Sequence, residues 1–500
     1  MKNVKTADRM NTGVKGLDEI LYGGLPPGQM YLLEGDPGTG KTTLAMQFII
    51  SGSRAGERSL YLSLSESKAG LEDSARSHGW NKDDLPIAEF IPAEAGLNPK
   101  QQYSVFHPSE IELSETIQKL TQLIDEVKPV RLVIDSLSEL RLLAADPMRY
   151  RRQLLALKHF FAGRDTTVLL LDDRTGGQDD MQLQSIAHGV LRLEKRRRSY
   201  GVTRRQVEII KLRGSAYREG YHDYTIVKGG LHIYPRLVAS EHDTFFDGER
   251  IKSELLALDK MFGGGINRGS STLLIGPSGS GKSTLAMAYA FAAARRGDRA
   301  IIYVFDEVLR TAQDRVEGLG MPVRAEIAKG ALAMSQVNPA ELSPGEFVSQ
   351  IREDVENKDT RVVVIDSLNG FLMSMPGEND LNLHLHELIS FLNQKGVVTF
   401  LIYTQHGLID SMQTEVDVSY LADTVILLRH FEAEGEIRQV LSVIKQRVGQ
   451  HERGLRELRM SEKGIDISET LSNFSGVLTG VPKLLGKSGQ KIGQRTESLI

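Results

Sequence analysis

The residues best suited to chemistry lie in two glycine-rich loops, each ending in a lysine and a hydroxyl residue. The first loop reads GDPGTGKT over residues 35–42, and the second reads GPSGSGKS over residues 276–283. Glycines let backbone N–H groups come close to phosphate oxygens, and the helix that starts there adds positive potential. We expect Lys41 and Lys282 to reach the outer phosphates of a nucleotide, and the hydroxyl residue after each lysine to hold Mg²⁺.

Both loops stand in the setting that a phosphate-binding loop requires. Each follows a short apolar strand, residues 30–33 or 272–275, and precedes a helical pattern, residues 44–48 or 285–288. The sequence therefore predicts two nucleotide sites with matching loop residues: Gly35, Gly38, Thr39, Gly40, Lys41, Thr42 and Thr43 in the first, and Gly276, Gly279, Ser280, Gly281, Lys282, Ser283 and Thr284 in the second.

An aspartate ends a further apolar strand in each half of the chain. These strands read LVID over residues 132–135 and VVID over residues 363–366. A carboxylate at the end of a central strand, beside the phosphate loop, suits the water shell of a bound metal. Asp135 and Asp366 are therefore the predicted magnesium carboxylates, and the alternative is an aspartate that only caps its strand.

Acidic residues follow one more strand in each half. The segment LYLSLSE ends in Glu66, and the segment IIYVFDE ends in Asp306 and Glu307. Phosphoryl transfer depends mainly on positioning and charge stabilisation, so a carboxylate here can polarise an attacking water or hydroxyl. Glu66, Asp306 and Glu307 are the predicted catalytic carboxylates. A solvated acid at a helix start is the alternative.

These motifs belong to an internal duplication that runs through most of the chain. The segment GLDEILYGGL over residues 16–25 precedes the first loop, and ALDKMFGGGI over residues 257–266 precedes the second. Apolar, β-branched runs that alternate with helical stretches predict a mostly parallel sheet covered by helices. We therefore expect two tandem α/β domains over residues 1–240 and 241–475, a linker near residues 240–250, and a flexible basic tail over residues 476–500.

The composition fits a globular protein of two or more domains. Of the 500 residues, 40% are hydrophobic and 25% are charged, which is ordinary for such proteins. There is no cysteine, so disulfides and thiolate metal sites are excluded. No apolar run reaches the length of a bilayer span and no signal-peptide pattern opens the chain, so we expect a cytoplasmic protein. The net charge of -4 does not favour dedicated nucleic-acid binding.

Two further clusters have competing interpretations. The basic run KRRR over residues 195–198, with two more arginines at residues 204–205, is compatible with electrostatic contact to nucleic acid. It also lies between two strand-like segments, which favours a solvated hairpin tip. His384 and His386 stand two residues apart without further ligands at metal spacing, which favours a helix surface over a zinc site.

The ordered set of motifs resembles the KaiC family, double-domain ATPases and autokinases of the cyanobacterial circadian clock. The resemblance rests on the paired loops, on GGLP at residues 23–26, on KLRG at residues 211–214 and on DTVILL at residues 423–428, and it extends to about Phe474. It implies tandem RecA-like domains stacked as two rings of a homohexamer, with ATP at the subunit interfaces. It also implies paired cations that reach a neighbour's nucleotide and neutralise transition-state charge there: Lys211 and Arg213 in the first ring, Lys445 and Arg447 in the second.

Some residues depart from the pattern of the family. Where its first domain has two adjacent glutamates, this chain has Ser65 and Glu66, so only the second acid remains. The neighbouring Ser and Thr phosphoacceptors of the family fall on Ser419 and Tyr420. The basic tail, rich in glycine and polar residues, does not resemble the segment that binds the activator KaiA.

The resemblance predicts a hexamer that binds ATP and Mg²⁺, hydrolyses ATP and phosphorylates itself in its second domain, acting as a clock-like or signalling timer with a KaiB-like or other partner. Two other classes remain open. A RecA- or DnaB-type motor on DNA would need a basic ring lumen or DNA-binding loops, which the net charge of -4 does not favour. A nucleotide-gated scaffold would use ATP only to close the ring for a signalling protein.

Overall fold

The computed structural model describes residues 9–90, 108–144, 146–174, 181–197, 201–373, 381–405, 420–472, 474–477 and 483–484. The chain divides into two compact units, residues 1–236 and 237–500. The division falls a few residues before the boundary expected at residue 240. Residues 242–249, within the expected linker, form neither helix nor strand.

The first unit contains, within its described residues, one sheet of nine strands. The strands are β1 (Met30–Gly35), β2 (Ser59–Ser63), β3 (Ile87–Glu89), β4 (Arg131–Asp135), β5 (Thr167–Asp173), β6 (Gly189–Arg196), β7 (Arg204–Leu212), β8 (Tyr221–Val227) and β9 (Gly230–Tyr234). Across the sheet their order is β3-β2-β4-β5-β1-β6-β7-β8-β9. Neighbours are parallel from β3 to β6 and antiparallel from β6 to β9.

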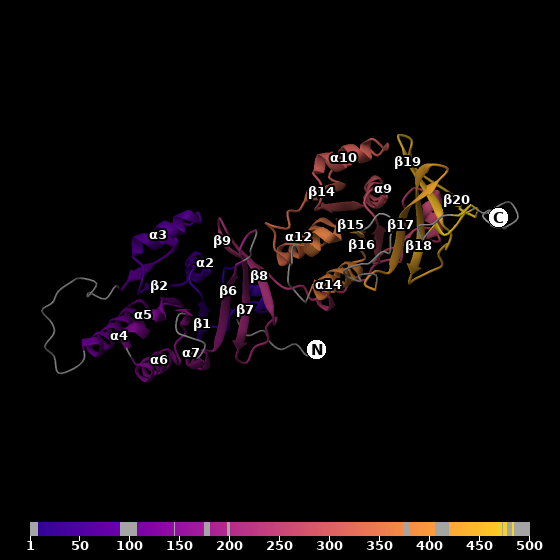
Figure 1. Cartoon of the computed structure of the whole chain (residues 1–500). Helices are drawn as coiled ribbons and strands as arrows, with labels where there is room; N and C mark the ends of the chain where they lie inside the picture. The colour runs from indigo at the N-terminus through magenta and orange to yellow at the C-terminus, as the bar shows by residue number, and fades with distance from the viewer. Residues whose placement is uncertain are drawn as a thin grey trace, which may run out of the picture. The chain divides into compact units, whose positions relative to one another are not determined.

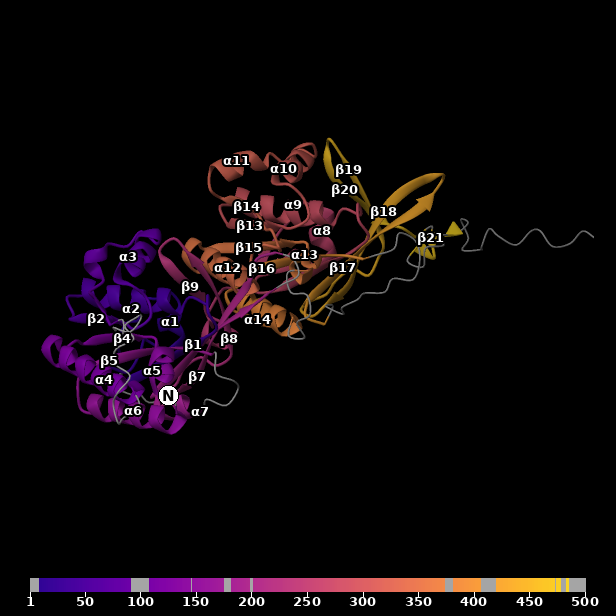
Figure 2. The ribbon, with the colours of Figure 1, turned by 60° about the vertical axis from the view of Figure 1, so that its left-hand side comes forward.

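The second unit repeats this sheet strand for strand. Its strands are β12 (Ser271–Gly276), β13 (Arg299–Val304), β14 (Leu332–Gln336), β15 (Thr360–Asp366), β16 (Val398–Thr404), β17 (Thr424–Ala433), β18 (Glu436–Gln446), β19 (Arg456–Ser461) and β20 (Gly464–Thr470). Their order is β14-β13-β15-β16-β12-β17-β18-β19-β20, with the antiparallel strands β17 to β20 gathered at one edge (Figures 1 and 2). Two short pairs lie outside the large sheets: β10 (Arg250–Ile251) with β11 (Ile266–Asn267), and β21 (Phe474–Ser475) with β22 (Lys483–Leu484). The predicted pair of mostly parallel α/β domains is confirmed.

Helices pack mainly against the parallel part of each sheet (Figure 1). Those of the first unit are α1 (Leu17–Ile20), α2 (Lys41–Arg54), α3 (Lys68–Ser77), α4 (Pro108–Val127), α5 (Leu137–Ala144), α6 (Pro147–Phe161) and α7 (Met181–Ile186). Those of the second are α8 (Leu256–Met261), α9 (Lys282–Arg295), α10 (Leu309–Glu317), α11 (Val323–Ala328), α12 (Pro344–Lys358), α13 (Leu368–Met373) and α14 (Leu381–Gln394). The helix that follows each phosphate loop, α2 or α9, contacts several strands of its sheet.

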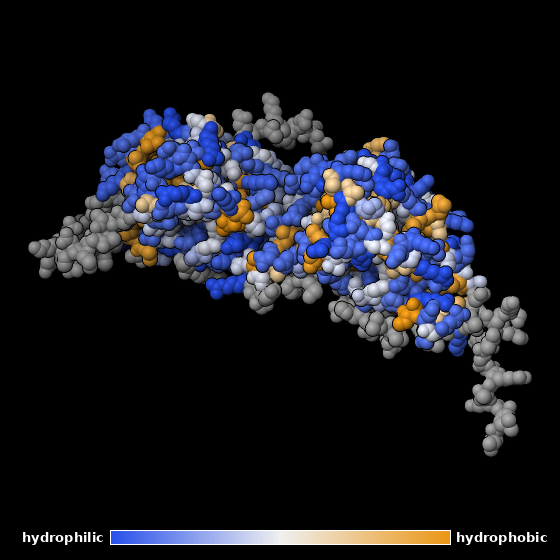
Figure 3. Space-filling view, turned by 90° about the horizontal axis from the view of Figure 1, so that it is seen from above, coloured by the Kyte–Doolittle hydropathy of each residue, from blue (hydrophilic) through white to orange (hydrophobic). Residues whose placement is uncertain are grey.

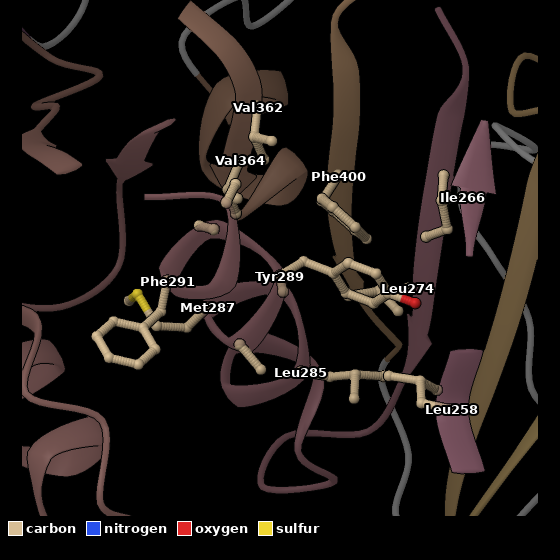
Figure 4. Close-up of a cluster of buried hydrophobic side chains, with 14 of the residues drawn as sticks. Leu258, Ile266, Leu274, Leu285, Met287, Tyr289, Phe291, Val362, Val364 and Phe400 are labelled. Atoms are coloured by element: carbon tan, nitrogen blue, oxygen red, sulfur yellow. The ribbon is translucent and has the colours of Figure 1, made fainter. Parts of the chain in front are cut away.

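The hydrophobic core fixes the helix that follows each loop. Every residue of β1 and β4 is buried, as expected for parallel strands covered on both faces. In the second unit, Leu285 and Tyr289 of α9 pack with Val364 and Phe400 of the sheet (Figure 4). Burial of each such side chain stabilises the fold by about 1.5–3 kcal/mol. The core therefore holds α9, and with it the loop, against the sheet.

The basic run lies in a hairpin, but not all of it is solvated. Strands β6 and β7 pair in antiparallel fashion with Arg196 opposite Arg204. Arg204 is buried, and its Nε lies 3.2 Å from a carboxylate oxygen of Asp223. The interpretation as a solvated tip is therefore wrong for Arg204, because a carboxylate on β8 compensates its burial.

Three other expectations concern the surface and the tail. His386 is exposed on α14, and the described residues contain no group of three His, Cys, Asp or Glu that could hold a metal ion. Within the predicted flexible tail, Lys483 and Leu484 pair with β21, so this short segment is ordered by backbone pairing. In the described part of the chain, every helix is too short or too polar to cross a membrane. On the face in Figure 3, hydrophobic residues form small separate areas among polar ones.

Candidate nucleotide sites

Each phosphate loop connects a central strand of its sheet to a buried helix. The first loop joins β1 to α2, and the second joins β12 to α9. Both helices begin after a glycine in the left-handed region, Gly40 (φ 98°) and Gly281 (φ 97°), a conformation that favours glycine. The side chains of Ile226 and Met460 pack beside these two glycines. The start of each helix thus offers N–H groups and positive potential to an anion at the C-terminal ends of the parallel strands.

The two loop lysines are buried but have different partners. Lys41 Nζ donates to a loop carbonyl at 2.7 Å and lies 2.7 Å from a carboxylate oxygen of Asp173. Lys282 Nζ donates to the Pro277 carbonyl at 2.6 Å, and no ion pair joins it to a described carboxylate. Burial lowers the pKa of Lys282 to about 8, while the charge of Asp366 opposes this shift. A phosphate therefore meets a paired cation in the first unit and an unpaired one in the second.

This difference comes from the ends of two equivalent strands. Asp173 ends β5 opposite Gly35, whereas Thr404 ends β16 opposite Gly276. Sequence analysis did not single out Asp173. The only signal was the contrast between LLLDD in the first half and FLIYT in the second. That contrast gains meaning only when strand pairing shows that both residues lie beside a phosphate loop.

The predicted magnesium residues lie together in the first unit. Thr42 Oγ1 donates to Asp135 Oδ2 at 3.1 Å, and the buried Tyr61 hydroxyl donates to the same oxygen at 2.5 Å. Burial raises the pKa of Asp135, while these two hydrogen bonds lower it. A hydroxyl and a carboxylate side by side at a phosphate loop are the oxygen donors that Mg²⁺ prefers. The residues therefore fit the metal.

The equivalent pair in the second unit is Ser283 and Asp366. Burial raises the pKa of Asp366 to about 6, and a hydrogen bond from Ser283 opposes the rise. Both residues line a cavity of about 520 Å³, a size in the range of small-molecule sites. Its charged lining consists of Lys282, Asp306, Glu307, Arg315 and Asp366.

The two predicted acids of the second unit have different partners. Asp306 accepts a hydrogen bond from the Ser367 hydroxyl. Glu307 accepts one from Arg315 Nη2, and Arg315 Nη1 donates to Thr284 Oγ1 at 3.4 Å. Sequence analysis missed Arg315, because a charged residue on an amphipathic helix carries no signal of the cavity that it lines. The structure thus adds a guanidinium to the second site.

Glu66 is the residue of the first unit that is equivalent to Glu307. Glu66 follows β2, which pairs with β4, and Glu307 follows β13, which pairs with β15 in the same way. Partial burial and the nearby charge of Asp135 raise the pKa of Glu66. Among the described residues no cation is paired with its carboxylate. The position equivalent to Arg315 is occupied by Ser74. The first site therefore has one acid that is not restrained by an arginine.

The cations predicted to act on a neighbour lie toward the other end of the sheets. Lys211 stands opposite Val190 near the start of β6, and Lys445 stands opposite Val425 near the start of β17. These strands are parallel to β1 and β12, whose C-terminal ends carry the loops. The backbone of Lys211 is separated from the start of the first loop by about 10 Å along the strands and about 10 Å across them. This is more than an extended lysine side chain can span to the loop of its own unit.

Several cations gather at this end of the strands in the first sheet. Arg213 Nη2 donates to the Ser185 carbonyl at 2.6 Å. Burial, together with the charges of Arg213 and Lys158, lowers the pKa of Lys211. Lys158, His188 and Arg213 line a cavity of about 150 Å³. The mutual repulsion of these cations favours an anionic partner at this end of the strands.

One candidate phosphoacceptor lies at the corresponding end of the strands in the second sheet. Arg447 Nη2 donates to the Tyr420 carbonyl at 2.6 Å, and Lys445 Nζ donates to the Ala422 carbonyl at 2.8 Å. The Tyr420 side chain is 51% exposed. Ser419 lies outside the described residues. Tyr420 therefore stands beside the two predicted trans-acting cations and toward the end of the sheet away from the loop of its own unit.

One more pair of matched residues lies close to the loops. A β-carbon on Gly38 would stand 3.6 Å from Lys195 Nζ, and His430 Nε2 lies 3.2 Å from the Ser278 carbonyl oxygen. Lys195 belongs to the basic run. Its place beside the first loop was not predicted, because a hairpin pattern does not show which other segment the hairpin lies beside.

The chain matches the family described as "ATPase: KaiC" over residues 10–238 and 251–472, one segment for each unit. It belongs to the KaiC family of ATPases. It is 28% identical over 492 residues to the circadian clock oscillator protein KaiC of Picosynechococcus sp., covering 96% of this chain and 93% of that protein. It is 26% identical over 494 residues to the protein of the same name from Acaryochloris marina, covering 96% and 92%.

A third relative is the circadian clock protein KaiC2 of Synechocystis sp., 27% identical over 481 residues, which cover 95% of this chain and 84% of that protein. These matches confirm the family predicted from the motifs. Because KaiC-family ATPases bind ATP, the family accounts for the presence of a phosphate loop in each unit.

Proposed function

We propose that this chain forms a ring in which each phosphate loop binds ATP with Mg²⁺ and is completed by a neighbouring copy. The observation that carries the proposal is the place of Lys211, Arg213, Lys445 and Arg447, away from the loops of their own units. A nucleotide at the loop of the same unit is out of their reach, so in this proposal the cations act on a nucleotide held by a neighbouring copy of the chain. Head-to-tail contacts of this kind give a ring when the rotation between copies closes, and the KaiC family suggests six subunits.

The residues of each site have distinct roles in hydrolysis. The loop lysine binds the outer phosphates, and the paired hydroxyl and aspartate hold Mg²⁺, which neutralises phosphate charge. Glu66 or Glu307 accepts a proton from the attacking water while the water oxygen bonds to the γ-phosphorus. The bond between that phosphorus and the bridging oxygen breaks, which leaves ADP and phosphate. Cations from the neighbouring copy stabilise the charge that develops.

Assembly can be measured directly by light scattering. With a non-hydrolysable ATP analogue, the wild-type chain should give a species near six subunits, because each nucleotide then links two copies. A double variant, Arg213→Ala with Arg447→Ala, should assemble less well at the same nucleotide concentration. A wild-type monomer at micromolar protein and saturating nucleotide would contradict the proposal.

Hydrolysis can be assigned to each unit by silencing the other. Lys41→Ala and Lys282→Ala should each weaken nucleotide binding in one unit. In the Lys282→Ala background, Glu66→Gln should lower turnover about 100-fold while ATP binding stays intact. Glu72→Gln, in the helix that follows, is the matched control. Unchanged turnover after Glu66, Asp306 and Glu307 are all replaced by amides would remove these carboxylates from the mechanism.

We propose in addition that the second unit phosphorylates itself, mainly on Ser419 and to a lesser extent on Tyr420. The place of Tyr420 beside Arg447 supports transfer between neighbouring subunits. The acceptor hydroxyl oxygen bonds to the γ-phosphorus, ADP leaves, and Asp306 or Glu307 takes the hydroxyl proton. The phosphate adds about two negative charges beside the cations at this end of the strands.

Incubation with radiolabelled ATP tests this step. Wild type should be labelled, Ser419→Ala should lose most of the label, and Lys282→Ala nearly all of it. Chains carrying Lys282→Ala, mixed with chains carrying Ser419→Ala and Tyr420→Phe, should regain label if transfer occurs between subunits. Absence of label in wild type over several hours would leave an ATPase without kinase activity.

The relatives are named as circadian clock proteins, and we propose a timing or signalling role for this chain with a KaiB-like or other protein partner. The timing role is tested by sampling the phosphate label over several days at constant temperature. A recurrent rise and fall supports a timer, and a label that settles at a steady level contradicts it.

A further inference from the structure

The cavity of the second unit contains a guanidinium at a position where the first unit has a serine. Arg315 lies on α10 and lines the same cavity as Lys282. In the first unit, the equivalent position on α3 is Ser74, at the same distance in sequence from Glu66 as Arg315 is from Glu307. At this position the two sites therefore differ by a permanent positive charge.

Arg315 connects the predicted catalytic acid to the helix of the phosphate loop. It donates through Nη2 to Glu307 Oε1 and through Nη1 to Thr284 Oγ1, the latter at 3.4 Å. The side chains of Arg315 and Glu307 are 33% and 28% exposed, so a ligand that enters the cavity can reach both. Burial raises the pKa of Asp366, and the charge of Arg315 is one of the effects that oppose this rise.

The ion pair has a chemical consequence for Glu307. A carboxylate oxygen that accepts from a guanidinium is less available to accept a proton from water. A terminal phosphate carries more negative charge than a carboxylate and offers a guanidinium two oxygens in a matching geometry. A nucleotide with a γ-phosphate can therefore compete for Arg315 and free Glu307 at the same time.

We propose that Arg315 is a positioning residue that pairs with Glu307 until ATP binds, and that its guanidinium then moves to the γ-phosphate. This inference rests on the proposed function, since it assumes that the cavity binds ATP. It gives the second site a preference for ATP over ADP, because ADP has no γ-phosphate to draw Arg315 from Glu307. The first site, with Ser74, lacks this source of preference.

The test uses the full chain with Lys41→Ala, in which the second unit is the remaining nucleotide site. Arg315→Ala should lower the ratio of ATP to ADP affinity by about tenfold or more, the usual effect of losing a charge-assisted hydrogen bond. It should also lower kcat, and Arg315→Lys should restore part of the ATP preference. Arg310→Ala is the matched control, since its side chain is 87% exposed on the same helix.

The reverse substitution tests the inference in the other unit. Ser74→Arg, in a chain with Lys282→Ala, should increase the preference of the first site for ATP, and it gives an answer even if Arg315→Ala fails to fold. A purely structural role for Arg315 would lower thermal stability while kcat and the affinity ratio stay as in the Lys41→Ala parent, and that result overturns the inference. A parent that neither binds nor hydrolyses ATP contradicts the proposed function itself, whereas an active parent with unchanged variants contradicts only the role of Arg315.

Discussion

Asp173 is one of the residues that distinguish the two sites. Its carboxylate lies 2.7 Å from the Lys41 ammonium, so a phosphate must displace it before that lysine is available. Asp173→Asn should therefore strengthen ATP binding in the first unit, by about tenfold if one charged interaction is relieved. Titration with a fluorescent ATP analogue in a chain with Lys282→Ala measures the effect. Thr404→Asp, the matched change in the second unit, should weaken binding there, and weaker binding in Asp173→Asn would refute the argument.

His222 predicts a pH dependence of stability at the same scale. Its Nε2 faces the Arg218 carbonyl, its Nδ1 accepts from the Arg236 N–H, and burial lowers its pKa to about 4. The unfolded chain binds a proton near the ordinary pKa of about 6.5, whereas the folded chain does not. Stability should therefore fall as pH drops from about 6.5 to about 4, by about 3 kcal/mol in total. Thermal unfolding across this range should show a smaller slope in His222→Gln; an equal slope would exclude this histidine as the cause.

At the scale of elements, the first glycine of each loop sets how closely two strands approach. A β-carbon on Gly276 would stand 2.2 Å from the carbonyl oxygen of Leu428 in β17. Because backbone cannot rotate away as a side chain can, Gly276→Ala should force β12 from β17 and displace the loop. We expect a loss of about 1–3 kcal/mol in stability and weaker nucleotide binding in the second unit. Gly248→Ala is the control, because the new β-carbon would have no atom within 4 Å outside its own residue and its chain neighbours. Native binding in Gly276→Ala would contradict this account.

The elements also show what the sequence could and could not predict. Apolar runs such as those that form β4 and β15 identify strands buried on both faces, and the loop motifs place them in order. Strand β20 reads GIDISET and lacks such a run, because a strand at the edge of a sheet is partly solvated. The outer antiparallel strands were therefore missed, whereas β6 and β7 were expected as a hairpin. Arg315 and Asp173 were missed for another reason. Asp173 acts through the pairing of β5 with β1, which are distant in sequence, and Arg315 acts through a cavity that it shares with Lys282. Periodicity reveals neither.

At the scale of the whole molecule, ligand binding should stabilise each unit in turn. A ligand that binds only the folded state at 100 times its Kd adds about 2.7 kcal/mol to stability. In thermal unfolding with a non-hydrolysable ATP analogue, the Lys41→Ala variant should therefore lose one part of the stabilisation by ligand, and the Lys282→Ala variant should lose another part. Full stabilisation in the double variant would show that the analogue binds elsewhere.

The presence of both nucleotide units in one polypeptide has a consequence for the cell. Translation delivers the two sites in equal number, so a change in expression alters the total capacity of both by the same factor. Expression level therefore cannot shift nucleotide from one kind of site to the other. Only the residues that distinguish the sites, among them Asp173 and Arg315, can make their occupancies respond differently to a change in the supply of ATP.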